Sequence, residues 1–224
     1  MKIIAVGMNY ANHNKEMQHS LVLSEPVIFM KPDSALLKGG KPFFIPGFSS
    51  EIHYETEVVV KINRLGKNIN EQFAHRYYNE VTVGIDVTAR DLQREFRQKG
   101  LPWELCKGFD GSAIIGDFIP LTEAIQKPDF HLESPNESCS NMPSYTIQNM
   151  DFHLDIDGRT VQKGNTSDMI YTVDRIIAYV SRFVTLKTGD LIYTGTPAGV
   201  GKVEIGNHLQ GYLNNRKLLD FYIR

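Results

Sequence analysis

Glu55 and Glu57 stand two positions apart in a stretch, residues 53–62, that otherwise has the composition of a β-strand. Because side chains alternate between the faces of a strand, these two carboxylates are expected to project side by side. Like charges held that close call for a cation between them, and hard divalent ions prefer oxygen ligands. The alternative is an edge strand with a polar face, but the valines at 58–60 favour burial on both faces.

A third carboxylate, Asp86, follows the apolar stretch 81–85 and directly precedes a predicted helix. The carboxyl end of a strand that leads into a helix is a frequent place for ligand binding. On that helix Arg90 and Gln93 are three residues apart and share a face, so both can meet one ligand. Solvated side chains are the equal alternative for this pair.

His13 and Glu16 have the same three-residue spacing in a short helix expected after Asn9, which would cap it. A histidine oriented by a carboxylate is a common arrangement for a general base. A surface turn with a chance pair is the other interpretation of the spacing. Lys31, at the end of the predicted strand 27–31, could likewise meet an anion or simply be solvated.

The glycine-rich stretch 194–201 permits close approach of the backbone to an anion. It is not a Walker loop, because Lys202 is misplaced for one and no helix is expected to follow.

Length and composition describe an ordinary globular protein. The chain has 224 residues, 42% of them hydrophobic, and a net charge of −2, which gives no sign of nucleic-acid binding. Its two cysteines, Cys106 and Cys139, indicate neither a disulfide framework nor a cysteine zinc site. Because no stretch has the length of a membrane span or of a signal-peptide core, we expect a soluble, cytoplasmic protein.

The elements that must position these residues alternate between strands and helices without a regular βαβ repeat. Helices are expected at 9–17, at 68–80 with Asn68 or Asn70 as cap, at 89–98 with Thr88 as cap, and at 172–183. Alternation around the Asp157–Gly158 turn predicts a hairpin over 152–162. Other strands are expected at 2–6, 27–31, 53–62, 81–86, 113–116, 191–193, 203–205, 208–213 and 217–223.

Five segments in one order resemble the fumarylacetoacetate hydrolase family, most closely its short acylpyruvase and oxaloacetate decarboxylase members. They are GMNYANHNKE (7–16), HYETE (53–57), GIDVTARDLQ (84–93), GLPWELCK (100–107) and TGTPAGVG (194–201). The resemblance covers nearly the whole chain, and it implies one α+β catalytic domain over 1–224, a mixed β-roll with flanking helices, usually a homodimer. A stretch at about 128–149 is longer than the family pattern and is expected to be a loop insertion.

The resemblance also implies roles for the candidate residues. Metal ligands would be Glu55, Glu57 and Asp86, holding Mg²⁺ or Mn²⁺, with Ca²⁺ as an occupant in a crystal. His13 and Glu16 would form a catalytic dyad on a short lid helix that orders when ligand binds, and Lys107 would be the active-site lysine. The residues around the substrate would be Arg90, Gln93 and Thr196.

The expected substrate is a small 2-oxo or 2,4-dioxo acid, bound through its keto and carboxylate oxygens. The main hypothesis is a hydrolase that cleaves a C–C bond of an acylpyruvate through a metal-bound enolate, giving pyruvate and a carboxylic acid. The same residues also suit an oxaloacetate decarboxylase, a keto–enol tautomerase, or an isomerase of 2-hydroxy-diene-dioates. A non-catalytic metal-binding protein is the alternative from a different class.

Overall fold

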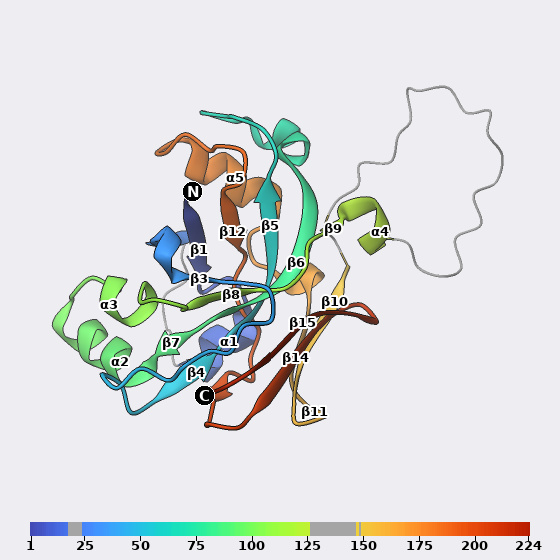
Figure 1. The fold of residues 1–224 in the computed structure, drawn as a ribbon. Coiled ribbons are helices and arrows are strands. Elements are labelled where there is room, and N and C mark those ends of the chain that lie inside the picture. Colours follow the sequence, from blue (N-terminus) through green and yellow to red (C-terminus); the bar gives the residue numbers. More distant parts are fainter. Residues whose placement is uncertain (18–23, 126–146, 148) are drawn as a thin grey trace.

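The computed structural model describes residues 1–17, 24–125, 147 and 149–224. One large, curled, mixed sheet runs through it (Figure 1), as the α+β expectation requires. Its strands lie in the order β2 (Val27–Lys31), β1 (Ile3–Gly7), β12 (Leu191–Tyr193), β5 (Thr56–Ile62), β6 (Tyr78–Asp86), β8 (Ala113–Ile115) and β3 (Leu36–Leu37), while β9 (Ile119–Pro120) pairs with β6.

Two smaller sheets complete the strand framework. An antiparallel sheet has the order β11 (Arg159–Asn165), β10 (Asp151–Ile156), β14 (His208–Leu213) and β15 (Arg216–Tyr222). A three-stranded sheet has the order β13 (Gly201–Lys202), β4 (Ile52–Tyr54) and β7 (Thr88–Ala89).

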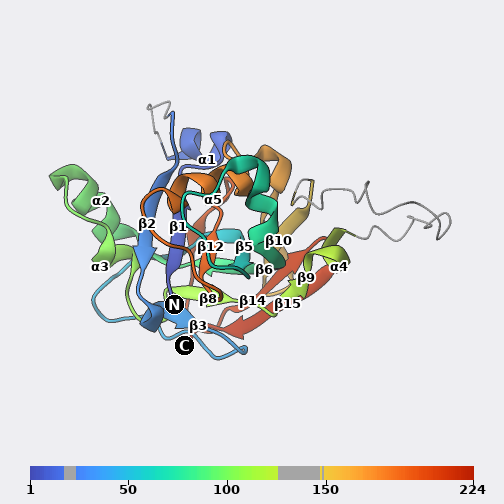
Figure 2. The ribbon, with the colours of Figure 1, turned by 90° about the horizontal axis from the view of Figure 1, so that it is seen from above.

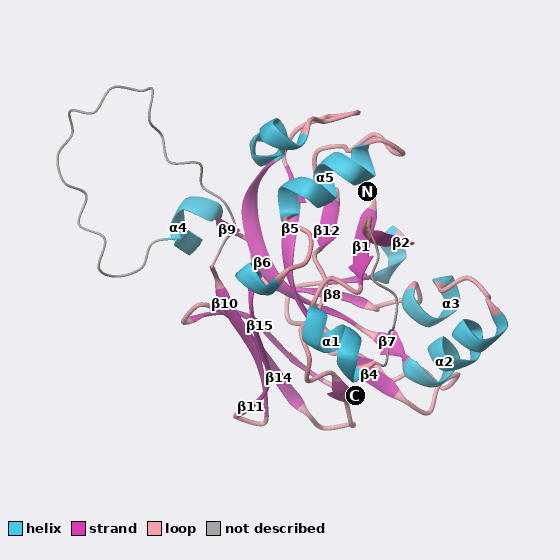
Figure 3. Ribbon diagram, turned by 180° about the vertical axis from the view of Figure 1, so that it is seen from behind, coloured by secondary structure: helices cyan, strands magenta, loops and turns pink. Residues whose placement is uncertain are grey.

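Helices cover the sheets at separate places. Seen from above, α5 crosses the central sheet, while α2 and α3 lie together at one side (Figure 2). From behind, α1 lies between the antiparallel sheet and α2 (Figure 3). The α-helices of the described residues are α1 (Ala11–Glu16), α2 (Arg90–Lys99), α3 (Glu104–Lys107), α4 (Leu121–Ile125) and α5 (Val173–Ser181), and the 3₁₀ turns are η1 (Asp33–Ala35), η2 (Glu71–Tyr77) and η3 (Thr166–Asp168).

The centre of the large sheet is buried on both faces. Val58, Val59 and Val60 on β5 are fully buried, so the unbroken valine run does indicate two-sided burial. On one face, Val58 and Val60 belong to the same apolar cluster as Ile176 of α5. This rigid strand carries Glu57 near its start and leaves Glu55 directly before it.

Several local predictions are confirmed. β10 and β11 form the expected hairpin, and both Asp157 and Gly158 have positive φ, as a two-residue turn of this kind requires. The helix expected at 172–183 is α5, and the hydroxyl of Thr172 accepts a hydrogen bond from the Arg175 amide and caps it. Gly100 ends α2 in the left-handed conformation, with φ of 65°.

The prediction of an α-helix at 68–80 is wrong. Asn70 does act as a cap, but the segment is the 3₁₀ turn η2, and the chain is already in β6 at Tyr78. Strand pairing prevails there, since Glu80 lies opposite Lys61 of β5 and forms an ion pair with it at 2.5 Å. α3 and α4 were not predicted, because each is too short to show helical periodicity.

Two predicted caps have other roles. Tyr10, not Asn9, occupies the cap position of α1, and the buried Asn9 amide bonds to main-chain atoms of Tyr171 and Thr194. Thr88 lies in β7, and Ala89 holds the cap position of α2. The strand expected at 203–205 is displaced to Gly201–Lys202, where it pairs with β4.

The expected insertion at about 128–149 falls almost wholly outside the described residues. None of the helices in the described ranges combines the length and apolar character that crossing a bilayer requires.

Candidate active site

A pocket opens where β5, β6, α1, α2, α3 and the loop after β12 meet. All of the residues predicted as metal ligands, catalytic residues or substrate-binding residues line this pocket except Glu16. Glu16 contacts His13, which does line it. The lining includes His13, Glu55, Glu57, Asp86, Arg90, Gln93, Lys107 and Thr196, together with Arg94, Arg97 and Trp103.

Glu55, Glu57 and Asp86 converge at the floor of this pocket. Each offers a carboxylate oxygen within 4.8 Å of the oxygens of the other two, and all three residues are at most 6% exposed. Three hard oxygen donors at this spacing could hold a divalent cation. The prediction from the alternation of Glu55 and Glu57, together with the position of Asp86, therefore describes a real cluster.

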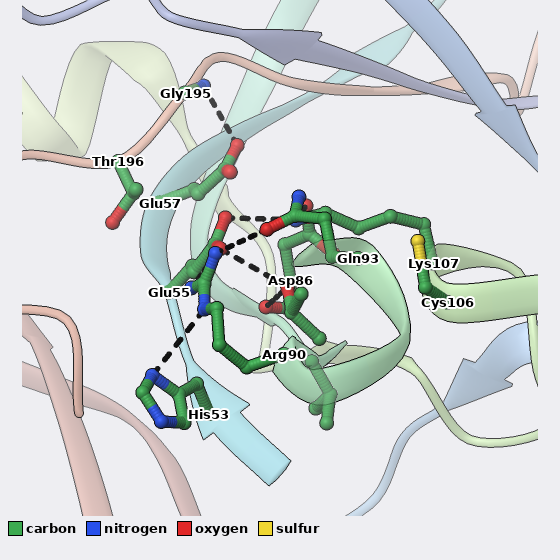
Figure 4. Close-up of polar contacts among 12 residues, drawn as sticks. His53, Glu55, Glu57, Asp86, Arg90, Gln93, Cys106, Lys107, Gly195 and Thr196 are labelled. Carbon is green, nitrogen blue, oxygen red and sulfur yellow. Dashed lines mark hydrogen bonds and ion pairs between the residues drawn. The ribbon is translucent and has the colours of Figure 1, made fainter. Parts of the chain in front are cut away.

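Buried cationic side chains lie beside the carboxylates, and Figure 4 shows two of them, Arg90 and Lys107. Lys107 contacts Glu55 at 2.8 Å and Asp86 at 2.7 Å, and Arg90 contacts Glu55 at 2.5 Å. Lys31 contacts Asp86 at 2.6 Å. Glu55 and Asp86 thus contact three cationic side chains, all of them buried.

Lys31 is buried and held by several contacts, which its sequence context did not indicate. Its side chain is fully buried, and besides its ion pair with Asp86 it donates to the carbonyl oxygens of Lys107 and Ser112. Burial and the neighbouring Lys107 lower the pKa of Lys31 against the pull of Asp86. The only sequence signal was a lysine at the end of an apolar strand, which is equally compatible with solvent exposure.

The two glutamates differ sharply in their electrostatics. Burial disfavours the charged form of Glu55, but Lys107 and Arg90 outweigh it and hold the pKa of Glu55 well below its usual range. Burial, with the nearby Asp86 and Glu55, raises the pKa of Glu57 well above its usual range. Within the described part of the chain Glu57 forms no ion pair, and its carboxylate accepts one hydrogen bond, at 2.7 Å from the Gly195 amide.

This imbalance fits a bound cation. A buried carboxylate that lacks a cationic side chain is stabilised in its charged form by a metal ion placed beside it. Glu57 presents that situation next to two further carboxylates. The donor set, all hard oxygens, suits Mg²⁺, Mn²⁺ or Ca²⁺ rather than a soft metal.

His13 and Glu16 form the predicted pair on α1. His13 Nδ1 lies 3.2 Å from Glu16 Oε2, and His13 is 7% exposed. The Glu16 carboxylate is in turn held by the Gly199 amide, at 3.1 and 3.2 Å. The glycine-rich stretch therefore does receive anions, but they are the protein's own carboxylates: Gly199 meets Glu16, and Gly195 meets Glu57.

Glycine is required at both of these positions. Gly195 and Gly199 have φ of 99° and 100°, a region that other residues rarely adopt. A Cβ at Gly195 would also lie 2.7 Å from the Cβ of Asn9. Both amides can reach their carboxylates only because the backbone takes these conformations.

Arg90 is held from three sides. Its Nη2 contacts Glu55, its Nη1 contacts Gln93 Oε1 at 2.5 Å, and its Nε donates to His53 Nδ1 at 3.4 Å. His53 Nε2 in turn lies 3.0 Å from Glu51. Burial and the charge of Arg90 lower the pKa of His53, which favours the neutral ring that this arrangement needs.

The Thr196 hydroxyl is already committed to the protein. It donates to the Thr56 carbonyl at 2.9 Å and accepts from Gln162 Nε2 at 2.8 Å. Gln162 also accepts from the Thr56 amide, so it ties β11 to the start of β5. Among the atoms of Thr196, the main chain is therefore better placed than the hydroxyl to meet a ligand.

Three residues around the carboxylate cluster were not predicted from the sequence. Thr88 donates to Glu55 Oε1 at 3.1 Å, and His53 and Gln162 act as just described. His53 lies beside Glu55 in the same motif, but nothing in the spacing distinguished it from a surface histidine. Trp103, which also lines the pocket, lies edge-on to Phe29, with ring centroids 5.7 Å apart.

The comparisons with known proteins agree with this geometry. The family described as "Fumarylacetoacetate (FAA) hydrolase C-terminal" matches residues 2–223. Oxaloacetate tautomerase FAHD1 of Mus musculus, named as mitochondrial, is 36% identical over 99% of this chain and 91% of its own length. Oxaloacetate tautomerase YcgM of Escherichia coli is 37% identical over 93% of this chain and 86% of its own length.

A solved structure shares the fold throughout. Fumarylpyruvate hydrolase from Pseudomonas aeruginosa, in complex with Mn²⁺ and pyruvate, superposes with a TM-score of 0.85 at 31% identity, covering 100% of this chain and 89% of that one. The curled mixed sheet and the cluster of three carboxylates define a family of enzymes. This chain belongs to the fumarylacetoacetate hydrolase family.

Proposed function

We propose that this protein is a cation-dependent enzyme that interconverts the keto and enol forms of oxaloacetate. The observation that carries the proposal is the His13–Glu16 pair on the wall of a pocket whose floor holds three carboxylates. Keto–enol exchange needs a positioned base and stabilisation of negative charge, and it requires neither a nucleophile nor a leaving group. Relatives named oxaloacetate tautomerase, at 36% and 37% identity, support it.

In this proposal Glu55, Glu57 and Asp86 hold Mg²⁺ or Mn²⁺. A cation held there would act as a Lewis acid, which would polarise the keto group of a 2-oxo acid and stabilise the negative charge that develops on its oxygen. Lys107, buried beside Glu55 and Asp86, adds positive charge at the same place.

His13 moves the proton. With Nδ1 protonated and donating to Glu16, the free lone pair is on Nε2, which can accept a proton from C3 of the substrate. The same nitrogen returns a proton to C3 in the reverse direction, and the enol oxygen gains or loses its proton by exchange with water. Glu16 and the Gly199 amide that holds it keep the ring in this tautomer and orientation.

The charge of the cluster favours a doubly negative substrate. Lys31, Lys107 and Arg90 equal the three carboxylates in number although they contact only Glu55 and Asp86, so a divalent cation adds two positive charges to a site that is otherwise neutral overall. Oxaloacetate carries two negative charges and restores neutrality.

The test is the ultraviolet absorbance of the enol form of oxaloacetate, followed with Mg²⁺, with Mn²⁺ and with EDTA. We expect enol decay to be accelerated with either metal and to return to the uncatalysed rate with EDTA. Acceleration that persists in EDTA would overturn the metal assignment. No acceleration with either metal would overturn the tautomerase proposal.

Hydrolysis of an acylpyruvate is the second candidate, favoured by the fold shared with fumarylpyruvate hydrolase. There, His13 would activate water for attack on the C4 carbonyl. Release of pyruvate from acetylpyruvate or fumarylpyruvate would identify it, and CO₂ release from oxaloacetate would identify a decarboxylase. Turnover of a hydroxymuconate-type diene would identify an isomerase, and metal binding without any turnover a non-catalytic protein.

The family likeness leads us to propose a homodimer as well, which light scattering after gel filtration would test. The cytoplasmic location stays a prediction, since the mouse relative is named as mitochondrial.

A further inference from the structure

The mouth of the pocket has a positive charge that the protein itself does not balance. Arg90, Gln93 and Arg97 lie three and four residues apart on α2 and share a face, and all three line the pocket. Arg90 is buried, Gln93 is half-buried and Arg97 is exposed, so this row runs from the floor of the pocket to its opening.

Each of the other cations that line the pocket or its floor contacts a carboxylate. Arg90 and Lys107 contact Glu55, Lys31 contacts Asp86, and Arg94 contacts Glu51 through both of its terminal nitrogens. Arg97 differs: in the described part of the chain its hydrogen bond is to the main-chain oxygen of Met17, at 3.4 Å, and no carboxylate pairs with it.

The position of Arg97 matches the far end of an extended substrate. Arg97 lies seven positions after Arg90 on the same helix, which places it roughly 10 Å further along the axis. A 2-oxo acid whose keto and carboxylate oxygens lie at the floor must direct the rest of its chain toward the opening. A second carboxylate at that end would meet a guanidinium free to form a charge-assisted, bidentate contact.

We infer that Arg97 is a specificity-determining residue, which binds the distal carboxylate of 2-oxo diacids and so distinguishes them from 2-oxo monoacids of the same length. This inference rests on the proposed function for the orientation of the substrate. It goes further by assigning the recognition of the distal charge to one residue outside the metal cluster and the dyad.

The test is equilibrium binding, so that it does not depend on turnover. 2-Oxoglutarate and 2-oxopentanoate have the same number of carbons and differ in a distal carboxylate against a methyl group. Their affinities would be measured by calorimetry in the presence of Mn²⁺ for the parent protein, Arg97→Gln and Arg94→Gln. Arg94 is the matched control, since it lies on the same helix and lines the same pocket but is paired with Glu51.

We expect Arg97→Gln to lower the affinity for 2-oxoglutarate about tenfold, because it removes one charged hydrogen-bonding contact. Binding of 2-oxopentanoate should be unchanged, and Arg94→Gln should alter neither affinity. Arg97 is exposed, so its replacement should leave the thermal midpoint unchanged.

The possible failures are distinguishable. Equal effects of Arg97→Gln on both ligands, or no effect on 2-oxoglutarate, would overturn the inference while leaving the proposed function intact. If Arg94→Gln lowers the affinity for 2-oxoglutarate as much as Arg97→Gln does, the effect is general electrostatic attraction and not a specific contact. That result would also overturn the inference. A parent protein that binds neither ligand would overturn the assignment of Arg97, whereas the proposed function stands or falls on the enol-decay assay.

Discussion

Two clusters in this molecule are built from the same kinds of side chain but differ in their surroundings. At the pocket floor, Asp86 contacts Lys31 and Lys107 and is 1% exposed. On the antiparallel sheet, Asp220 contacts Lys217 and His208, both at 2.6 Å, and its side chain is 41% exposed. Ion pairs of similar length therefore occur both in a buried region and in a solvent-exposed one.

The difference shows what marks a site. At the surface, hydrogen bonds from Lys217 and His208 hold the pKa of Asp220 below its usual range, and water screens whatever charge remains. In the pocket, burial and neighbouring carboxylates raise the pKa of Glu57 instead. A buried carboxylate without a cationic partner distinguishes the pocket, whereas the number of ion pairs does not.

The largest effect is expected for Asp86→Asn. Loss of this charge leaves Lys31 and Lys107 underpaired in a buried region, which should lower the free energy of unfolding by about 3 kcal/mol. Metal-dependent turnover should fall more than about 100-fold. Denaturant unfolding and the enol-decay assay measure the two effects. Parent-like values in both would show that the buried cluster behaves like the surface one.

His13→Gln should remove the base without disturbing the cluster. Turnover is expected to fall roughly 10²- to 10⁴-fold, the usual contribution of a positioned general base. Mn²⁺ affinity, measured by calorimetry, should stay at the parent value because His13 belongs to the dyad on α1. A parent rate in the variant would show that another group moves the proton.

His53→Gln and His208→Gln form a matched pair, because each histidine contacts a carboxylate through Nε2. His53 also accepts from Arg90 Nε, so its replacement should loosen Arg90 and raise KM about tenfold with a smaller effect on kcat. His208→Gln should leave both constants unchanged. Steady-state kinetics test this. His53→Asn should restore part of the loss, because its amide oxygen can take the position of the ring Nδ1, whereas the longer Gln side chain carries its oxygen further out.

The metal should stabilise the protein more strongly as pH rises. Because the folded pKa of Glu57 is raised, the metal-free fold is favoured when Glu57 is protonated and loses that contribution as pH increases through the raised value. Cation binding requires the charged form, so the gain in Tm with Mg²⁺ should be larger at about pH 8 than at about pH 6. Thermal scans with and without Mg²⁺ test this, and an equal gain at both pH values would argue against Glu57 as a ligand.

The smallest effect is expected for Asp220→Asn. An exposed pair contributes little to stability, so Tm should change by about 2 °C or less and turnover should not change. Raising the salt concentration should change the parent and the variant alike. A large loss of Tm would mean that the surface cluster is more than a screened pair.

Much of the site could be predicted because it depends on local spacing. Alternation along a strand places Glu55 and Glu57 together, and the three-residue spacing on a helix pairs His13 with Glu16. The hairpin at 152–162 follows an equally local rule. Where pairing with a distant strand decided the outcome, as at Tyr78–Glu80, local propensity failed.

By itself, the sequence determined the strand of paired glutamates, the dyad on α1 and the likeness to one family. Only the tertiary structure decided that Lys31 is buried against Asp86, that His53 supports Arg90, and that Glu57 is left without a cationic partner. The reason is physical. Burial and charge balance are sums over residues that are distant in the chain, and the spacing within any one segment does not contain them.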